Sequence, residues 1–329
     1  MISVHMEDGK VSIQHRPLPR RPAGFALIRM LCAGICNTDL ELQRGYYGFR
    51  GTPGHEFVGE VMAADTRGLA GRRVVGEINL ACGNCDWCRR RQGRHCPGRK
   101  VLGIVRQPGV FAEYFVLPES NLHRVPESVP TESAVFAEPL AAACEILDQV
   151  RIPRGAAVAV LGDGKLGLLI AQVLHLHGAE VHLYGHHRER MRIAAAAGIR
   201  TAQPPARPRA LYDWLVEATG SAAGLSLAIR MVCPRSTIVM KSTVHAQVAI
   251  DFAHLIVNEI TLIGSRCGRF QPALRLLREG KMRVSEMISA RMPLSEAPRA
   301  FDLAAAKGSL KVLLFPDKAA DQGNSLLRK

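Results

Sequence analysis

The stretch AAVAVLGDGKLGLLIAQVLHLHG, residues 156–178, decides the fold class of this chain. Its first six residues form a continuous apolar run, which is typical of a buried parallel strand. Residues 166–177 then have the apolar spacing of a helix. The turn between strand and helix has the pattern G-x-G-x-x-G, made by Gly162, Gly164 and Gly167. A strand, a glycine turn and a helix in this order predict a dinucleotide-binding unit.

Each glycine of the turn has a physical role in such a unit. The first allows the tight turn, the second lets a pyrophosphate approach the backbone, and the third lets the helix pack on the strand. Free N–H groups at the helix N-terminus attract the phosphates. We therefore predict that Gly162, Gly164, Lys165 and Gly167 bind the cofactor. A glycine turn without a ligand is the alternative.

The residues after the second expected strand, 181–184, indicate which dinucleotide is bound. An NAD site usually has an Asp or Glu there, about 20 residues after the turn, which accepts a hydrogen bond from the ribose 2′-hydroxyl. This window holds His186, His187 and Arg188 and no acid. Donors and positive charge suit a 2′-phosphate, so the pattern favours NADP over NAD. A shifted strand end would bring Glu189 into the window and leave NAD open.

The wider pattern of the chain predicts two kinds of domain. In the N-terminal part, short β-type runs are separated by glycine and proline, at residues 26–30, 57–62, 73–78 and 112–117. Further on, strands and helices alternate, with expected strands at 214–218, 237–240 and 260–263. The proline-rich residues 199–210 are expected to form a surface connection. The fold class is therefore α/β, a doubly wound parallel sheet beside a β-rich domain.

The cysteines predict a structural metal site. The chain has nine of them, and an odd number without a secretory signal argues against a disulfide framework. Four lie close together with gaps of two, two and seven residues: Cys82, Cys85, Cys88 and Cys96. Tetrahedral zinc takes four thiolates at about 2.3 Å, and gaps of two residues let a loop turn its sulfur atoms inward. We predict a structural zinc site.

Three short segments predict a second, catalytic zinc. They read CNTD at 36–39, GHE at 54–56 and AEPL at 137–140. A catalytic zinc keeps three protein ligands and an open position, and cysteine, histidine and carboxylate all suit it. Each segment alone is unremarkable. The prediction of a catalytic zinc site depends on their occurring together with the cysteine loop and the glycine turn.

The net charge of +14, from 43 basic and 29 acidic residues, makes binding to nucleic acid a function to consider. Part of the excess lies at 89–100, RRRQGRHCPGRK, so a zinc-stabilised nucleic-acid-binding protein is one alternative. It offers only Trp87 for stacking near this segment and leaves His55 and Glu56 unexplained, so no nucleic-acid partner is expected. A second alternative is a non-catalytic dinucleotide-binding protein of the same fold.

No membrane partner is expected either. No apolar stretch approaches the ~18 residues that a membrane span requires. The N-terminus, MISVHMEDGK, lacks a basic region followed by an apolar one. We expect a cytoplasmic protein.

Taken together, these motifs resemble the zinc-containing medium-chain dehydrogenases/reductases, the group of alcohol, polyol, glucose and threonine dehydrogenases. The resemblance spans about residues 11–314. Beside the cysteine loop, its markers are AGICNTDLE at 33–41, GTPGHEFVGEV at 51–61, GVFAEYFVLP at 109–118, AEPLA at 137–141 and VLGDGKLG at 160–167. It implies a Rossmann cofactor domain, a GroES-like catalytic domain, and hydride transfer between NAD(P) and an alcohol or polyol, or its aldehyde or ketone.

The resemblance also implies ligands for the catalytic zinc. Cys36 and His55 would bind it, and Asp39 would orient His55. Glu56 and Glu138 would be the third ligand and its alternate, or one of them would act through bound water. Glu138 stands where the alcohol dehydrogenases carry a second cysteine, so the chain is more similar to the polyol and glucose dehydrogenase branch.

Other residues follow from the same resemblance. Thr38 would hold the substrate alcohol by a hydrogen bond and begin the proton relay. Many relatives have a relay histidine five positions after the cysteine, and Glu41 stands there instead. Lys311 would approach the cofactor diphosphate.

The family pattern divides the chain into a discontinuous catalytic domain, residues 1–144 and 290–329, and a Rossmann domain, residues 145–289. Relatives are generally dimers or tetramers joined through the cofactor-domain sheet, so a homodimer or homotetramer is expected. The apolar run 260–263 suits that contact.

Overall fold

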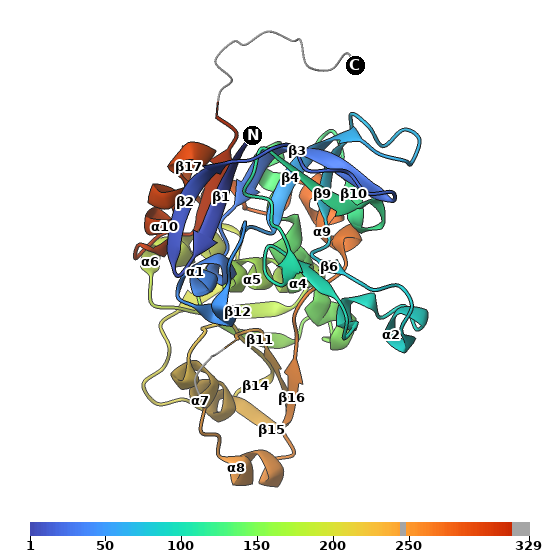
Figure 1. Cartoon of the computed structure of the whole chain (residues 1–329). Helices are drawn as coiled ribbons and strands as arrows, with labels where there is room; N and C mark the ends of the chain where they lie inside the picture. Colours follow the sequence, from blue (N-terminus) through green and yellow to red (C-terminus); the bar gives the residue numbers. More distant parts are fainter. Residues whose placement is uncertain (244–247, 318–329) are drawn as a thin grey trace.

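The computed structural model describes residues 1–243 and 248–317. Two large sheets form two parts of the molecule, one above the other in Figure 1. In the upper part lies a seven-stranded sheet, and in the lower part a six-stranded parallel sheet. The predicted combination of a doubly wound sheet and a β-rich domain is confirmed.

The six-stranded sheet has all its strands parallel, in the order β13-β12-β11-β14-β15-β16. Its strands in that order are Arg200–Ala202, Glu180–Tyr184, Ala157–Leu161, Tyr212–Glu217, Val232–Met240 and Thr261–Gly264. The helices of this part are α5 (Lys165–His177), α6 (Arg188–Ala196), α7 (Ala222–Met231) and α8 (Phe252–Val257). The order reverses direction at β11, which is the arrangement of a dinucleotide-binding fold. Strand β13 lies inside the segment predicted to be only a connection.

The seven-stranded sheet combines distant parts of the chain. Its strands are β3 (Phe25–Gly34), β4 (Glu56–Ala63), β5 (Arg73–Gly76), β9 (Tyr114–Pro118), β10 (Leu122–Arg124), β17 (Ile288–Pro293) and β18 (Lys311–Phe315). Strand β18 pairs antiparallel with β3, so the chain returns to this sheet after completing the parallel one. Helices α1 (Asn37–Gln43), α3 (Thr131–Ala134) and α10 (Ala297–Ala305) accompany it.

Smaller elements complete the upper part. Strands β1 (Ile2–Glu7) and β2 (Lys10–His15) form a hairpin, and β6 (Asn79–Leu80), β7 (Lys100–Leu102) and β8 (Arg106–Gln107) form a small sheet. The cysteine loop, residues 82–96, contains the short helix α2 (Asp86–Arg89) and projects at the side of the molecule (Figure 1). We call residues 82–96 the zinc loop.

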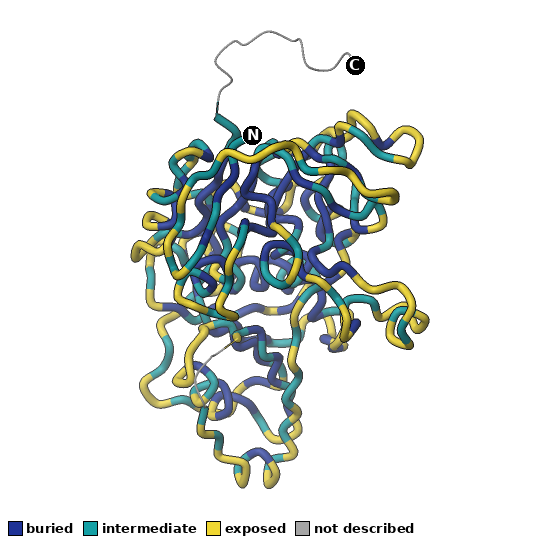
Figure 2. The backbone as a smooth tube through the Cα atoms, viewed as in Figure 1, coloured by how far each residue is buried: buried dark blue, intermediate teal, exposed yellow. Residues whose placement is uncertain are grey.

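Helix α4 (Ala137–Gln149) joins the two parts. It contacts α5 and α9 (Phe270–Arg278) and also β4 and β5. One buried apolar cluster includes Val58 of β4, Leu140 of α4 and Leu169 of α5, so a shared core holds the two sheets together. Figure 2 shows buried segments gathered in the interior of the molecule, with the exposed ones mostly at its periphery.

The predicted domain boundaries fall within regular elements. The boundary at 144/145 lies inside α4, and that at 289/290 lies inside β17. The division into 1–144 with 290–329 and 145–289 stays a prediction, and its last residues, 318–329, are outside the described part. Within the described residues, no helix is both long and apolar enough to cross a membrane.

Candidate catalytic metal site and cofactor cleft

Three predicted zinc ligands meet at one end of the seven-stranded sheet. Cys36 is the N-cap of α1, directly after β3, and Glu56 begins the neighbouring strand β4. His55 immediately precedes that strand. One ligand atom from each of Cys36, His55 and Glu56 lies within 4.8 Å of the other two. Because β3 and β4 are paired at Gly34 and Glu56, residues 20 positions apart are brought to the same point.

The donor set suits zinc. His55 and Glu56 are buried, and Cys36 is partly buried. Glu56 Oε1 is buried without a hydrogen-bond partner among the described residues, so this oxygen is available to a cation. Thiolate, imidazole and carboxylate are ordinary zinc ligands, and three of them leave a fourth position open.

Asp39, in the first turn of α1, contacts both Cys36 and His55. Its Oδ2 accepts a hydrogen bond from the Cys36 backbone N at 2.8 Å, and its Oδ1 lies 3.3 Å from His55 Nδ1. Burial by itself would lower the pKa of His55, but Asp39 and Cys36 beside the ring hold that pKa well above its usual value. Asp39 therefore lies where the predicted orienting carboxylate would be.

Lys311 contacts the group formed by Cys36, His55 and Glu56, which we call the metal-type group. Its ammonium donates a hydrogen bond to Glu56 Oε2, and both side chains are buried. Burial opposes the charged form of Lys311, yet Glu56 raises its pKa above the usual value. The pairing of β18 with β3 directs this side chain toward Glu56, and its predicted approach to the cofactor diphosphate stays a prediction.

Glu138, at the start of α4, lies near this group but outside it. Burial raises the pKa of Glu138, while His55 opposes and Glu56 reinforces this shift. Glu138 therefore interacts electrostatically with His55 and Glu56 without being part of the group that they form with Cys36.

The two residues predicted for proton transfer have different surroundings. Thr38 is close to the metal-type group, since the Cys36 thiol points at Thr38 Oγ1 at 3.7 Å. Glu41, one turn further along α1, accepts a hydrogen bond from Arg44 at 2.6 Å. The structure thus brings Thr38 next to Cys36 and pairs Glu41 with Arg44.

The glycine turn follows β11 at the carboxyl edge of the parallel sheet. Gly162 has φ of +113°, and a Cβ there would meet Ala218 O at 2.5 Å. A Cβ on Gly167 would lie 1.9 Å from Gly162 O, so helix α5 packs directly on the turn. At Gly164, by contrast, an added Cβ meets no described atom within 4 Å. The turn therefore leaves no room for a side chain at Gly162 or Gly167, whereas the space beside Gly164 is open, as the approach of a diphosphate requires.

Lys165 connects this turn to the metal-type group, which the sequence analysis did not foresee. Its Nζ lies 3.3 Å from the carbonyl oxygen of Ile35, the residue before Cys36. Burial and the nearby Lys311 lower the pKa of Lys165. The first residue of α5 thus extends across to the predicted zinc ligands.

Strand β12 ends at Tyr184 and α6 begins at Arg188, so Glu189 belongs to the helix and not to the strand end. His186 and Arg188 are exposed. His187 is already engaged: its backbone N donates to Asp163 Oδ2 at 2.6 Å, and its Nδ1 lies 3.1 Å from both carboxylate oxygens.

Asp163 is a carboxylate beside His187 that the sequence analysis overlooked. It lies between two glycines of the turn, and Arg190 is a further cation 3.9 Å away. Burial opposes ionisation, but the hydrogen bonds from His187 lower the pKa of Asp163. Its position inside the glycine pattern was the available indication.

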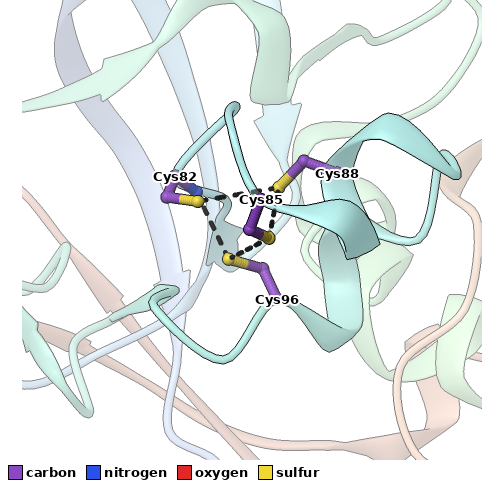
Figure 3. A group of neighbouring side chains, drawn as sticks. All are labelled: Cys82, Cys85, Cys88 and Cys96. Carbon is purple, nitrogen blue, oxygen red and sulfur yellow. Dashed lines mark hydrogen bonds between the residues drawn. The ribbon is translucent and has the colours of Figure 1, made fainter.

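The four cysteines of the zinc loop gather as predicted (Figure 3). Cys85 Sγ lies 3.5 Å from Cys88 Sγ and 3.7 Å from Cys96 Sγ. Cys82 Sγ lies 3.9 Å from Cys88 Sγ. A hydrogen bond from the Asn84 backbone is the main cause that lowers the pKa of Cys82 to about 6, which favours a thiolate. Four sulfur atoms at such separations fit a tetrahedral zinc.

A dinucleotide fold facing a cysteine, histidine and carboxylate group defines a metal-containing nicotinamide oxidoreductase. Models of two families match the chain: the alcohol dehydrogenase GroES-like domain over residues 22–127 and zinc-binding dehydrogenase over residues 166–279. The chain belongs to the zinc-dependent medium-chain dehydrogenase/reductase family. It is a zinc-containing alcohol dehydrogenase-like oxidoreductase, and the nucleic-acid alternative is not favoured.

Relatives and a solved structure match the chain over most of its length. Sorbitol dehydrogenase of Halalkalibacterium halodurans is 30% identical, over 94% of this chain and 96% of that protein. D-altritol 5-dehydrogenase of Agrobacterium fabrum is 31% identical, over 88% and 92%. A zinc-binding dehydrogenase from Sinorhizobium meliloti, solved with NADP bound, superposes with a TM-score of 0.88 at 29% identity, over 96% and 99%.

Proposed function

We propose that this protein transfers a hydride between NADP and a polyol, or the matching carbonyl compound. The observation that carries the proposal is the meeting of Cys36, His55 and Glu56 beside Lys165, the residue of the cofactor turn. A metal site and a cofactor site joined in this way suit transfer between a substrate held at one and a nicotinamide held at the other.

The roles proposed for individual residues follow from their positions. Cys36, His55 and Glu56 hold zinc, which when bound supplies a Lewis acid that lowers the pKa of a substrate hydroxyl. Asp39 orients His55. Thr38 accepts the substrate's hydroxyl proton and passes it toward solvent, while hydride leaves the carbon for the nicotinamide. Lys311 balances the charge of Glu56, and Glu138 acts as the alternate carboxylate.

The substrate class is tested by a panel of polyols and simple alcohols. The relatives named above act on sorbitol and D-altritol, so acyclic polyols are the first choice. We expect the zinc-loaded protein to form NADPH from NADP with at least one polyol. Tight cofactor binding without turnover on any alcohol or carbonyl compound would instead support the non-catalytic, dinucleotide-binding alternative.

The preference for NADP is proposed to depend on His186 and Arg188. We expect Arg188→Ala to raise the dissociation constant of NADPH about 30-fold, since a hydrogen bond to a charged group contributes about 2 kcal/mol. NADH has no 2′-phosphate, so its binding should stay within about twofold. Fluorescence titration of both cofactors measures this.

The matched control for that titration is Arg192→Ala, because Arg192 is exposed on the same helix, one turn further on. It should bind both cofactors like the original protein. Tighter binding of NADH than NADPH by the unaltered protein would contradict the proposed role of the exposed cations after β12.

We further propose that two copies associate through the edge of the parallel sheet. Strand β16 forms that edge in the described residues, and α8 beside it exposes Phe252 by 65%, Ile256 by 73% and Val257 by 79%. Apolar side chains gathered at an open strand edge are typical of an interface. A homodimer would cover them, and a homotetramer could be built from such dimers.

Ile256→Asp should raise the dissociation constant of this dimer at least about 100-fold, because it places an unpaired charge in an apolar contact. Light scattering after gel filtration over a range of concentrations measures the effect. Leu18→Asp, at an exposed leucine far from α8 in sequence, is the control and should leave the mass unchanged. A monomeric unaltered protein would refute the proposal.

A further inference from the structure

Arg94 belongs to the zinc loop but makes its contacts elsewhere. Its Nη1 donates to Glu145 Oε2 of α4 at 2.9 Å and to the Cys267 carbonyl oxygen at 2.8 Å. The Arg94 side chain is 25% exposed and that of Glu145 is 10% exposed. A largely desolvated guanidinium therefore connects the loop, α4 and the chain after β16.

The segment that begins with the last residue of β16, residues 264–269, is held at further points. Arg266 donates to the Arg94 carbonyl oxygen at 3.0 Å, so Arg94 and this segment bond each other in both directions. Lys241 Nζ donates to Arg266 O at 2.8 Å and to Ser265 Oγ at 3.1 Å. The same ammonium donates to Ala142 O of α4 at 2.7 Å.

Close packing leaves this segment little freedom. A Cβ on Gly268 would lie 1.8 Å from Ala141 O, so the two backbones touch. Arg269 next to it forms two hydrogen bonds with Asp148, at 2.7 and 3.0 Å. Segment 264–269 is thus clamped between α4 and the zinc loop.

The fold places segment 264–269 on the side of the parallel sheet toward which the nicotinamide half of a bound dinucleotide must run. A dinucleotide lies across the carboxyl ends of the strands, with its diphosphate at the turn after β11. The cations that suit the adenosine ribose follow β12, on one side of β11. Strands β14, β15 and β16 lie on the other side, so the nicotinamide half must run toward them. Segment 264–269 follows β16 at this end.

The metal-type site is also close to this segment. Burial raises the pKa of Cys267, and Glu138 is the carboxylate that adds most to the shift. Burial lowers the pKa of Lys241 to about 8, and Glu138 is among the carboxylates that oppose this change. The segment therefore packs on α4 at Ala141, about one turn after Glu138.

We propose that Arg94 is a positioning residue through which the zinc loop holds segment 264–269 against the nicotinamide end of the cofactor site. The inference rests on the proposed function, because it assigns to the loop a part in aligning cofactor and substrate. A displaced nicotinamide loses hydride-transfer rate while the adenosine half of the cofactor stays bound.

The test compares two variants of Arg94 with a control on the same loop. Arg94→Lys keeps the charge but cannot span Glu145 and Cys267 O as a guanidinium does. The double variant Arg94→Met, Glu145→Met removes both charges, so that no buried charge is left unpaired. Arg90→Met removes an exposed arginine of the zinc loop and serves as the control.

We expect both Arg94 variants to lower kcat about 30-fold, since a displacement of about 1 Å can cost up to 100-fold. The deuterium isotope effect on kcat should rise as hydride transfer becomes limiting. Binding of 2′,5′-ADP, which lacks the nicotinamide, should not change. Zinc content and melting temperature should match those of Arg90→Met.

Three results would overturn the inference. Arg94 variants with the kcat and isotope effect of Arg90→Met would show that the contact does not position the cofactor. A loss of zinc or of thermal stability in proportion to activity would show a merely structural role, and so would equal weakening of 2′,5′-ADP and NADPH. Failure of the proposed function is distinct, because the unaltered protein itself would then show no turnover, whether or not it binds the nicotinamide cofactor.

Discussion

Replacing His55 by alanine should lower kcat/KM for the polyol at least about 1000-fold. His55 is 3% exposed and contributes one of three ligand atoms that lie within 4.8 Å of each other. Its removal leaves a pair of ligands, and a Lewis acid contributes several kcal/mol to such a reaction, with each 1.4 kcal/mol worth about tenfold. Initial rates and zinc content per chain, measured on the same sample, test this.

The controls separate the loss of metal from general damage. His15→Ala, at an exposed histidine of the β1–β2 hairpin, should retain full activity and zinc. Glu138→Gln should retain the catalytic zinc, because Glu138 lies outside the ligand group, whereas Glu56→Gln should lose it. Activity of His55→Ala close to that of the unaltered protein would rule out the proposed ligand set.

Replacing Cys96 by serine should unfold the zinc loop. Cys96 is fully buried, and its sulfur lies 3.7 Å from that of Cys85. Metal binding at structural sites contributes directly to folding, because the ligands converge only in the folded state. We expect zinc to fall from two ions per chain to one, and trypsin to cleave at residues 89–91, RRR, at least about 100-fold faster.

Cys233→Ser is the matched control, since Cys233 is a partly exposed cysteine of β15 outside both groups. It should keep both zinc ions and resist trypsin. Removing zinc from the unaltered protein with a chelator should reproduce the cleavage at 89–91. A chelated protein with an intact, resistant loop would contradict the structural-zinc prediction.

The features that the sequence alone predicted depend on residues close together in the chain. The glycine turn spans residues 162–167, and strand, turn and helix appear in the structure at their predicted places. The cysteines lie within residues 82–96, so the loop itself brings their sulfur atoms together. In both cases the local spacing restricts the backbone to few conformations, and the chemistry can be inferred before the fold is known.

Other features depended on contacts between distant segments. Lys311 is 255 residues from Glu56, and only the pairing of β18 with β3 brings its ammonium to that carboxylate. The ring and backbone of His187 are held by Asp163, 24 residues earlier. No periodicity along the chain indicates such partners.

The sequence by itself determined the fold class, the zinc-type cysteine cluster, the glycine turn and the residue types of the catalytic site. The tertiary structure decided which of them meet: Glu56 with Cys36 and His55, Lys165 with Ile35, and Arg94 with Cys267. The reason is physical. Secondary structure and short loops follow from local dihedral preferences and apolar spacing, whereas side-chain partners follow from the packing of sheets and helices whose register the local sequence does not contain.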